Sequence, residues 1–185
     1  MFELLIKKLA KGLDKLKIPY MIIGGQAVLL YGVPRLTRDI DITLGLDVDS
    51  LPAIQKLCRD LKLNIKPKNA GEFVKRTMVL PAEDPKTRIR VDFIFSFSAY
   101  EKEAIERASR VKIKDYNARF ASVEDIMIHK IFAGREIDLV DVENIMRKIG
   151  KRKIDMAYIK RWLSELQGPS CDTNLLSVFN KILAG

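Results

Sequence analysis

Two aspartates stand one residue apart in an otherwise apolar segment, Asp39-Ile40-Asp41-Ile42. Successive side chains of a β-strand alternate across the sheet, so both carboxylates are expected on one face and both isoleucines on the other. Carboxylates held side by side repel each other unless a cation lies between them, and their hard oxygen atoms favour Mg²⁺ or Mn²⁺. Because Asp is depleted in strands, the pattern indicates a metal site more than its alternative, an exposed strand edge.

A third carboxylate, Asp92, lies between Val91 and Phe93. An isolated carboxylate in such apolar surroundings is unfavourable unless it is paired or metal-bound, so three acids on two strands suffice for a metal site. Gly24-Gly25 separates a predicted strand from a predicted helix, where the missing side chains let a phosphate approach the backbone N–H groups of the first helical turn. Taken alone, a glycine pair at a strand end is more often only a turn.

Few other residue types are available for chemistry. The 185-residue chain has one His and two Cys, widely separated, which excludes a zinc site, a disulfide framework and most His-based catalysis. The formal net charge is +9 and is spread along the chain, in agreement with phosphate ligands and not with a basic DNA-binding tail. No apolar stretch approaches the roughly 18 residues of a membrane span, and no signal peptide is evident. We expect a cytoplasmic protein with Cys58 and Cys171 as reduced thiols.

The elements that position the acids follow from the hydrophobic pattern. Apolar residues at helical spacing predict an amphipathic helix from the N-terminus to near Lys17. Ser50 is expected to cap a helix that runs through Leu61. Short apolar or alternating runs predict strands at Tyr20–Ile23, Arg38–Leu44, Phe73–Leu80 and Arg88–Phe97. The last two form a predicted hairpin around the turn-rich Pro81–Pro85.

The second half of the chain is predicted to be mostly helical. A helix over Tyr100–Arg110 is followed by two short extended pieces, and Ser122 with Asp125 three residues later resembles a capping box. Glycines separate the helices predicted at Ile126–Ala133, Ile137–Ile149, Ile154–Leu166 and Leu175–Leu183. The fold class is therefore α+β, a small mixed β-sheet flanked by helices with a helical C-terminal part.

Together, the glycine pair, the segment from Arg35 to Ile42 and Val91-Asp92-Phe93-Ile94 resemble the DNA polymerase β-type nucleotidyltransferase superfamily. Within it, the chain is most similar to the AbiEii-like group of small nucleotidyltransferases, which includes toxins of toxin–antitoxin pairs. The resemblance covers roughly Tyr20 to Ile149. It implies the polymerase β-like fold, with a catalytic core over residues 1–122 and a helical region over residues 123–185 that completes the nucleotide site.

The resemblance also implies roles for individual residues. In this family the first two acids bind two divalent metals, the third completes the site and helps to activate the attacking hydroxyl, and the glycine turn holds the triphosphate. These roles fall on Asp39, Asp41, Asp92, Gly24 and Gly25. Many members have Gly-Ser at this turn, whereas Gln26 follows the second glycine here.

The segment from Asp125 to Lys130, with Arg135, Asp138 and Asp141, is similar to the family's downstream helical motif, in which a Lys, an Arg and an Asp face the nucleotide. Lys130 as a point charge and Arg135 as a planar fork both suit triphosphate oxygens. Asp138 and Asp141 share a helix face, and for Asp141 an ion-paired surface is an equal alternative.

Arg38 is expected to bind nucleotide phosphates. For Arg38, as for Arg35 and Thr37, pairing with the nearby acids is the other open interpretation.

The resemblance implies metal-dependent transfer of an NMP from an NTP such as ATP to an acceptor hydroxyl, with Mg²⁺ or Mn²⁺ as cofactor. A role as the toxin of a toxin–antitoxin pair is a further expectation. The acceptor stays open between RNA such as tRNA, protein and small molecules. The alternative is a non-catalytic nucleotide-binding or RNA-binding module with the same fold.

Overall fold

The computed structural model describes residues 1–33, 36–96, 98–168 and 174–184, so Arg35 and Cys171 lie outside the described residues. The chain forms two compact units. The sheet unit comprises Met1–Gln26 and Leu36–Ala121, and the helical unit comprises Ala27–Arg35 and Ser122–Gly185. The segment between the glycine pair and the acidic strand thus groups mostly with the C-terminal helices.

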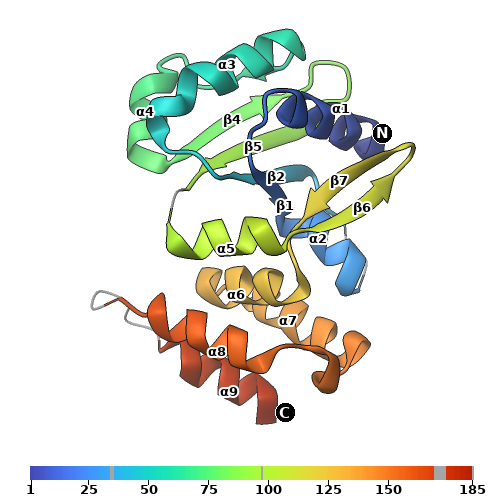
Figure 1. The fold of residues 1–185 in the computed structure, drawn as a ribbon, viewed down its shortest axis with the longest axis vertical. Helices are drawn as coiled ribbons and strands as arrows, with labels where there is room; N and C mark the ends of the chain where they lie inside the picture. Colours follow the sequence, from blue (N-terminus) through green and yellow to red (C-terminus); the bar gives the residue numbers. More distant parts are fainter. Residues whose placement is uncertain (34–35, 97, 169–173, 185) are drawn as a thin grey trace. The chain divides into compact units, whose positions relative to one another are not determined.

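Within the described ranges, the sheet has seven strands in the order β3-β4-β5-β2-β1-β7-β6 (Figure 1). It is mixed, because β2 pairs parallel with β5 and β1 parallel with β7, while the other neighbours are antiparallel. The α+β prediction is confirmed. The strands are β1 (Tyr20–Ile23), β2 (Asp39–Leu44), β3 (Asn64–Ile65), β4 (Val79–Glu83), β5 (Arg90–Phe95), β6 (Ser109–Ile113) and β7 (Tyr116–Phe120).

The helices fall into an N-terminal and a C-terminal group. The first group is α1 (Phe2–Lys15), α2 (Gly24–Tyr31), α3 (Leu51–Asp60), α4 (Ala70–Thr77) and α5 (Ala99–Arg107), with the 3₁₀ turn η1 (Val48–Ser50). The second group is α6 (Val123–Ala133), α7 (Glu136–Ile149), α8 (Met156–Glu165) and α9 (Leu175–Ala184), with the 3₁₀ turn η2 (Lys151–Lys153). Across the described ranges, none of these helices has the length and apolar character needed to span a bilayer.

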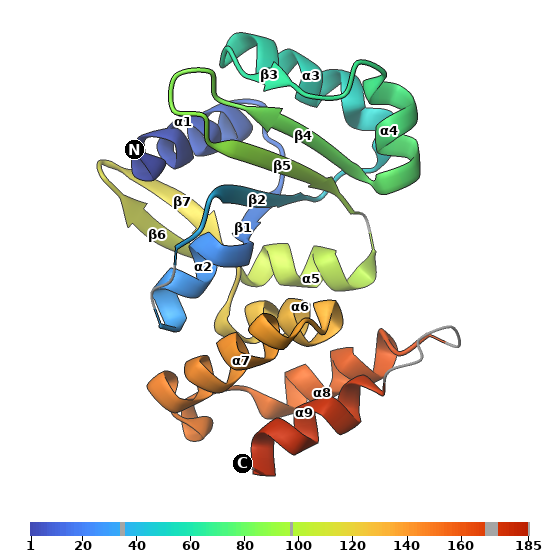
Figure 2. The ribbon, with the colours of Figure 1, turned by 180° about the vertical axis from the view of Figure 1, so that it is seen from behind.

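The core of the sheet unit lies on one face of the central strands. Alternation along β2 and β5 places Ile40 beside Val91 and Ile42 beside Phe93, and all four are fully buried. Helices α1 and α3 pack against each other at Gly12, where a Cβ atom would lie 2.6 Å from Leu57 Cδ1. Both helices lie on one side of the sheet (Figure 2). Because the isoleucines occupy the core face, Asp39 and Asp41 lie on the opposite face.

The start of the helical unit confirms the predicted capping box. Ser122 Oγ accepts a hydrogen bond from the Asp125 backbone N–H at 3.2 Å and donates to Asp125 Oδ2 at 2.5 Å. Asp125 Oδ1 also accepts a bond from the Tyr158 hydroxyl at 2.8 Å, which ties α6 to α8. Gly134, with φ of +66°, ends α6 in the left-handed conformation that glycine favours.

The strand predicted at Phe73–Leu80 is wrong over most of its length, because Ala70–Thr77 forms α4. Ala70 and Val74 are buried one helical turn apart, and Met78, with φ of +59°, ends the helix. A short apolar run with basic residues fits either a strand or the last turn of an amphipathic helix, so periodicity did not separate the two.

The hairpin with β5 is confirmed, but its first strand is shifted so that Pro81 lies inside β4. The Pro81 carbonyl accepts a bond from the Lys66 N–H at 3.0 Å, on the side away from β5. A proline is tolerated there because the β4–β5 ladder does not need its missing N–H.

The start of α3 also differs from the prediction. Ser50 makes no capping hydrogen bond through its side chain; instead Asp47 accepts a bond from the Asp49 N–H and caps η1, which leads into α3. Within α3, Cys58 is a free thiol, and burial raises its pKa to about 12. The prediction of a reduced Cys58 agrees with this buried position.

Truncation of the sheet core tests the packing. Phe93 is fully buried in β5, so Phe93→Ala is expected to lower the free energy of unfolding by about 3–5 kcal/mol through lost transfer energy and a cavity. Phe132→Ala removes the same ring from a side chain that is 58% exposed and is expected to change stability by less than about 1 kcal/mol. Urea unfolding followed by circular dichroism measures both values; equal losses would contradict the core assignment.

Candidate functional site

The three predicted acids lie together on one face of the sheet. In the parallel register of β2 and β5, Asp41 lies beside Asp92, and Asp39 lies beside Arg90. Neighbouring strands are about 4.8 Å apart, so these four side chains form one group, here called the acid cluster. Asp39 and Asp41 are half-buried, and Asp92 is only 7% exposed.

Arg90 neutralises the most buried of these acids. Its Nε donates to Asp92 Oδ1 at 2.9 Å, and its Nη2 donates to Asp92 Oδ2 at 2.5 Å, a bidentate pair within one strand. The pKa of Arg90 is raised, first because Asp92 accepts its hydrogen bonds and further because the charges of Asp92, Asp39 and Asp41 favour the cation. Sequence reasoning missed Arg90, although the period of two that predicts the strand places it on the face of Asp92.

The donor set of the acid cluster fits a divalent metal in its chemistry. Three adjacent carboxylates supply the hard oxygen atoms that Mg²⁺ and Mn²⁺ prefer. As the side chains stand, no group of three or more His, Cys, Asp and Glu in the described part of the chain is arranged to hold a metal ion. The Arg90 guanidinium donates a hydrogen bond to each of the two oxygen atoms of Asp92, the third acid.

The glycine pair makes room for the protein's own side chains. Gly24 has φ of +64°, and a Cβ atom on it would lie 1.9 Å from Asp41 Oδ2. A Cβ on Gly25 would lie 2.6 Å from Thr37 Cγ2. The two glycines form the first residues of α2 rather than a separate turn, so the Asp41 carboxylate lies at the start of that helix. Their predicted contact with a triphosphate stays a prediction.

Gln26 supports the acidic strand. Its Nε2 donates to Thr37 Oγ1 at 2.6 Å and is 3.5 Å from the backbone oxygen of Asp39. Gln26 and Thr37 are both buried, so the amide fixes the segment that leads into β2. Of the basic residues predicted to bind phosphate near this strand, Arg38 is exposed, and Arg35 is outside the described residues.

A second charged cluster lies in the helical unit and contains the other predicted site residues. Lys130 on α6 pairs with Asp138 Oδ1 and with Asp141 Oδ2, the latter at 3.0 Å. Arg135 Nε pairs with Asp138 Oδ2 at 2.5 Å. Lys130, Asp138 and Asp141 are buried, whereas the side chain of Arg135 is 71% exposed. The alternative for Asp141 is an ion-paired residue on the solvated surface. The ion pair is present, but Asp141 is buried, so the expected exposure to solvent is wrong.

The electrostatics of this cluster centre on Asp138, which is fully buried. Burial alone would raise the pKa of its carboxyl, but hydrogen bonds from Arg135 and Lys130 outweigh burial and hold the pKa below its usual value. Removing one partner of such a group leaves the remaining charges uncompensated in a buried position.

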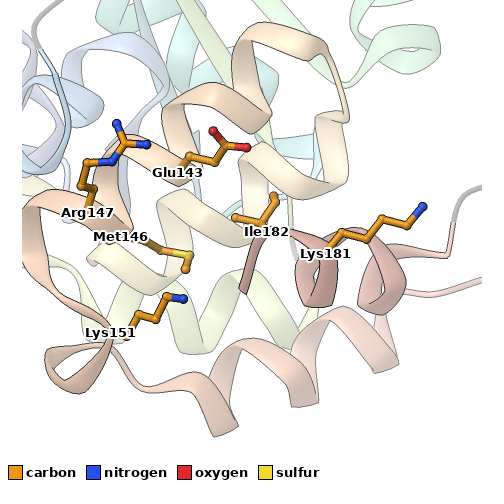
Figure 3. A pocket seen from close by; sticks show the side chains of 6 residues that line it. All are labelled: Glu143, Met146, Arg147, Lys151, Lys181 and Ile182. Carbon is orange, nitrogen blue, oxygen red and sulfur yellow. The ribbon is translucent and has the colours of Figure 1, made fainter. Parts of the chain in front are cut away.

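A hollow of about 380 Å³ in the helical unit carries no predicted site residue. It is lined by Glu143, Met146, Arg147, Lys151, Lys181 and Ile182. Figure 3 shows Lys181 pointing away from Met146 and Lys151, so the cationic groups do not converge on one point. Lys151 Nζ instead donates to the Leu183 carbonyl at 2.6 Å in the last turn of α9.

The close approach of Gly24 and Asp41 predicts a specific sensitivity. Gly24→Ala is expected to lower the free energy of unfolding by about 2 kcal/mol or more, since a positive φ is unfavourable by about 1–2 kcal/mol and the new methyl group must displace Asp41. Gly71→Ala in α4 is the matched control, because a Cβ there meets nothing within 4 Å and alanine favours a helix. Thermal unfolding measures both; equal stabilities of the two variants would contradict the proposed clash.

The Asp138 cluster predicts a pH dependence. A carboxyl whose pKa is lowered on folding stabilises the fold above its usual pKa of about 3.9, and this stabilisation is lost as the pH falls through the folded-state pKa. Asp138→Asn is therefore expected to lower stability by about 3 kcal/mol at neutral pH, and the difference from wild type should narrow below about pH 4. Glu143→Gln, on the exposed side of α7, is expected to change stability by less than about 0.5 kcal/mol. Urea unfolding at several pH values tests this; a pH-independent difference would contradict it.

Comparison with solved structures agrees with the fold described above. The antibiotic-resistance factor ANT(2'')-Ia matches with a TM-score of 0.57 and 18% identity over 89% of this chain and 94% of its own. An antigenic nucleotidyltransferase-like protein from Paracoccidioides brasiliensis matches with a TM-score of 0.56 and 20% identity over 94% of this chain and 91% of its own. These similarities show a shared nucleotidyltransferase fold. A search of curated proteins found no matching sequence.

The match to a protein family identifies the family of the chain, because it compares the amino-acid sequence and not only the fold. Residues 12–163 match the family described as "Nucleotidyl transferase AbiEii toxin, Type IV TA system". The match covers most of the chain, including all residues of the acid cluster and the charged cluster of the helical unit. The resemblance inferred from the glycine pair and the three acids is thereby confirmed. The chain belongs to the AbiEii nucleotidyl transferase family, a toxin family of type IV toxin–antitoxin systems.

Proposed function

We propose that the protein transfers an NMP from an NTP to an acceptor hydroxyl in a reaction that depends on Mg²⁺ or Mn²⁺. The hydroxyl oxygen attacks the α-phosphorus in line, a new P–O bond forms, and pyrophosphate leaves with the electrons of the broken bond. The observation that supports this proposal is the grouping of Asp39, Asp41 and Asp92 on one sheet face, beside the start of α2.

In this proposal, Asp39, Asp41 and Asp92 would hold the divalent metal, which would supply positive charge against the phosphate oxygens. Asp92 lies on the strand next to Asp41 and is assigned to accept the proton of the attacking hydroxyl. Gln26 is a positioning residue that holds the approach to β2.

The phosphate contacts are assigned to two places. Gly24 and Gly25 at the start of α2, with Arg38, are assigned to the triphosphate, since the first N–H groups of a helix favour negative charge. In the helical unit, Arg135 is assigned to the nucleotide, because its side chain is exposed. Lys130 and Asp138 are buried partners in the same ion-paired cluster, so they are assigned to positioning Arg135. Residues 1–122 are proposed as the catalytic core, and residues 123–185 as a region with a supporting role in nucleotide binding.

The acceptor is proposed to be RNA, a protein or a small molecule that carries a hydroxyl group. A structure of ANT(2'')-Ia contains adenylyl-2''-tobramycin, but at 19% identity that protein shares only its fold with this chain. Incubation with each α-³²P-labelled NTP, Mg²⁺ or Mn²⁺ and total cell extract tests the three classes. The fraction that becomes labelled identifies the acceptor and the preferred nucleotide.

Removal of the acids tests the proposed chemistry. Asp39→Asn and Asp41→Asn are each expected to lower transfer of labelled nucleotide at least about 1,000-fold, because the metal loses a charged ligand. Asp60→Asn is the matched control, since Asp60 is an exposed residue of α3 that pairs with Lys56 at 2.7 Å. Its transfer rate is expected to equal that of wild type. Retained transfer in both acid variants would refute the proposal, and tight NTP binding by wild type without transfer to any fraction would favour the non-catalytic alternative.

A further inference from the structure

Arg90 is a cation that belongs to the protein itself and lies where the proposed chemistry needs metal ions. We propose that Arg90 competes with the divalent metal for Asp92 and thereby sets the metal affinity of the acid cluster. The inference rests on the proposed function and deepens it, because it concerns how the same site is regulated by metal concentration.

The first argument is the geometry of the ion pair. Arg90 and Asp92 lie two residues apart on β5 and point to the same face, so the guanidinium reaches both carboxylate oxygen atoms of Asp92. The bidentate pair engages both oxygen atoms of Asp92, whose neighbour on β2 is Asp41, so a metal at Asp92 would share these oxygen atoms with the guanidinium. Metal ligation by Asp92 is therefore weaker while the guanidinium stays in place and stronger when it moves away.

The second argument is that Arg90 is the more exposed partner of the pair. Its side chain is 59% exposed, whereas that of Asp92 is 10% exposed, so the cation is the partner that can leave. On the other side of β5, Glu83 of β4 lies directly beside Arg90 in the antiparallel register. Arg90 also lines a hollow of about 490 Å³ together with Lys66, Pro67, Phe73 and Pro81. Glu83 already pairs with Lys66 at 2.9 Å and with Arg88 at 3.0 Å, so a rotation of the Arg90 side chain that releases Asp92 places the guanidinium in solvent.

The third argument is charge balance. Three carboxylates and one guanidinium on adjacent strand positions give the acid cluster a formal charge of −2. Without a metal, Arg90 is the cation that relieves the repulsion around buried Asp92. With a metal, two cations meet the same carboxylate and repel each other, so each weakens the binding of the other.

The test measures metal binding directly. Free Mn²⁺ is quantified by electron paramagnetic resonance during titration of wild type, Arg90→Gln and Arg88→Gln. Arg88 is the matched control, because it is 73% exposed and pairs with Glu83 at 3.0 Å instead of with the acid cluster. Arg90→Gln is expected to bind Mn²⁺ about tenfold more tightly than wild type, which corresponds to the loss of one charge-assisted hydrogen-bonded pair. Arg88→Gln is expected to bind as wild type does.

A second readout is thermal unfolding. Arg90→Gln is expected to melt at a lower temperature than wild type without metal, since Asp92 loses its partner, and to gain more from added Mn²⁺. If Arg90→Gln does not fold, Arg90→Lys replaces it; a lysine keeps the charge but lacks the planar fork, so its Mn²⁺ affinity is expected to rise by about threefold.

The outcomes separate this inference from the proposed function. Equal or weaker Mn²⁺ binding by the Arg90 variant, while wild type still transfers labelled nucleotide, would overturn the role of Arg90 and leave the transferase in place. Absence of both Mn²⁺ binding and transfer in wild type would overturn both. Tighter binding in Arg90→Gln together with unchanged binding in Arg88→Gln supports the competition.

Discussion

The repulsion among three carboxylates on one sheet face is the constraint on which the sheet unit depends. Two carboxylates about 5 Å apart repel by on the order of 3 kcal/mol at an effective dielectric constant of 20. The parallel register of β2 and β5 brings Asp41 and Asp92 to adjacent positions and so creates this repulsion. It persists only because the opposite face of the same strands is fully buried and because Arg90 supplies a positive charge.

The two faces of the central strands thus differ: one packs into the hydrophobic core, and the other carries the acid cluster. The isoleucines of β2 and the aromatic residues of β5 hold the register through burial, and a slip of one residue would place the acids in the core. Such a slip is far less favourable than the carboxylate repulsion, so hydrophobic packing decides the position of the charged groups. The helical unit applies the same principle differently, with Lys130 and Asp138 placed inside a buried ion-paired cluster.

Much of this arrangement could be predicted from local patterns. The period of two in Asp39–Leu44 predicts both the strand and the shared face of its acids, and the spacing of Ser122 and Asp125 predicts the start of α6. The helix at Ala70–Thr77 could not be separated from a strand, because a run of this length satisfies both periods. The pairing of Arg90 with Asp92 depends on side-chain rotamers, and the contact of Gly24 with Asp41 depends on how β1 and β2 pair. Neither the Arg90–Asp92 pair nor the Gly24–Asp41 contact can be predicted from the local sequence.

The contact between Gly24 and Asp41 also constrains which substitutions this sequence can accept during evolution. A residue other than glycine at position 24 is excluded chiefly by the carboxylate at position 41 and by a positive φ that only a few residue types tolerate. In a descendant that no longer used the carboxylate and carried a smaller residue at position 41, the steric part of this exclusion would disappear. The two positions are therefore expected to change together, with loss of the acid opening the way for an asparagine or aspartate at the start of the helix.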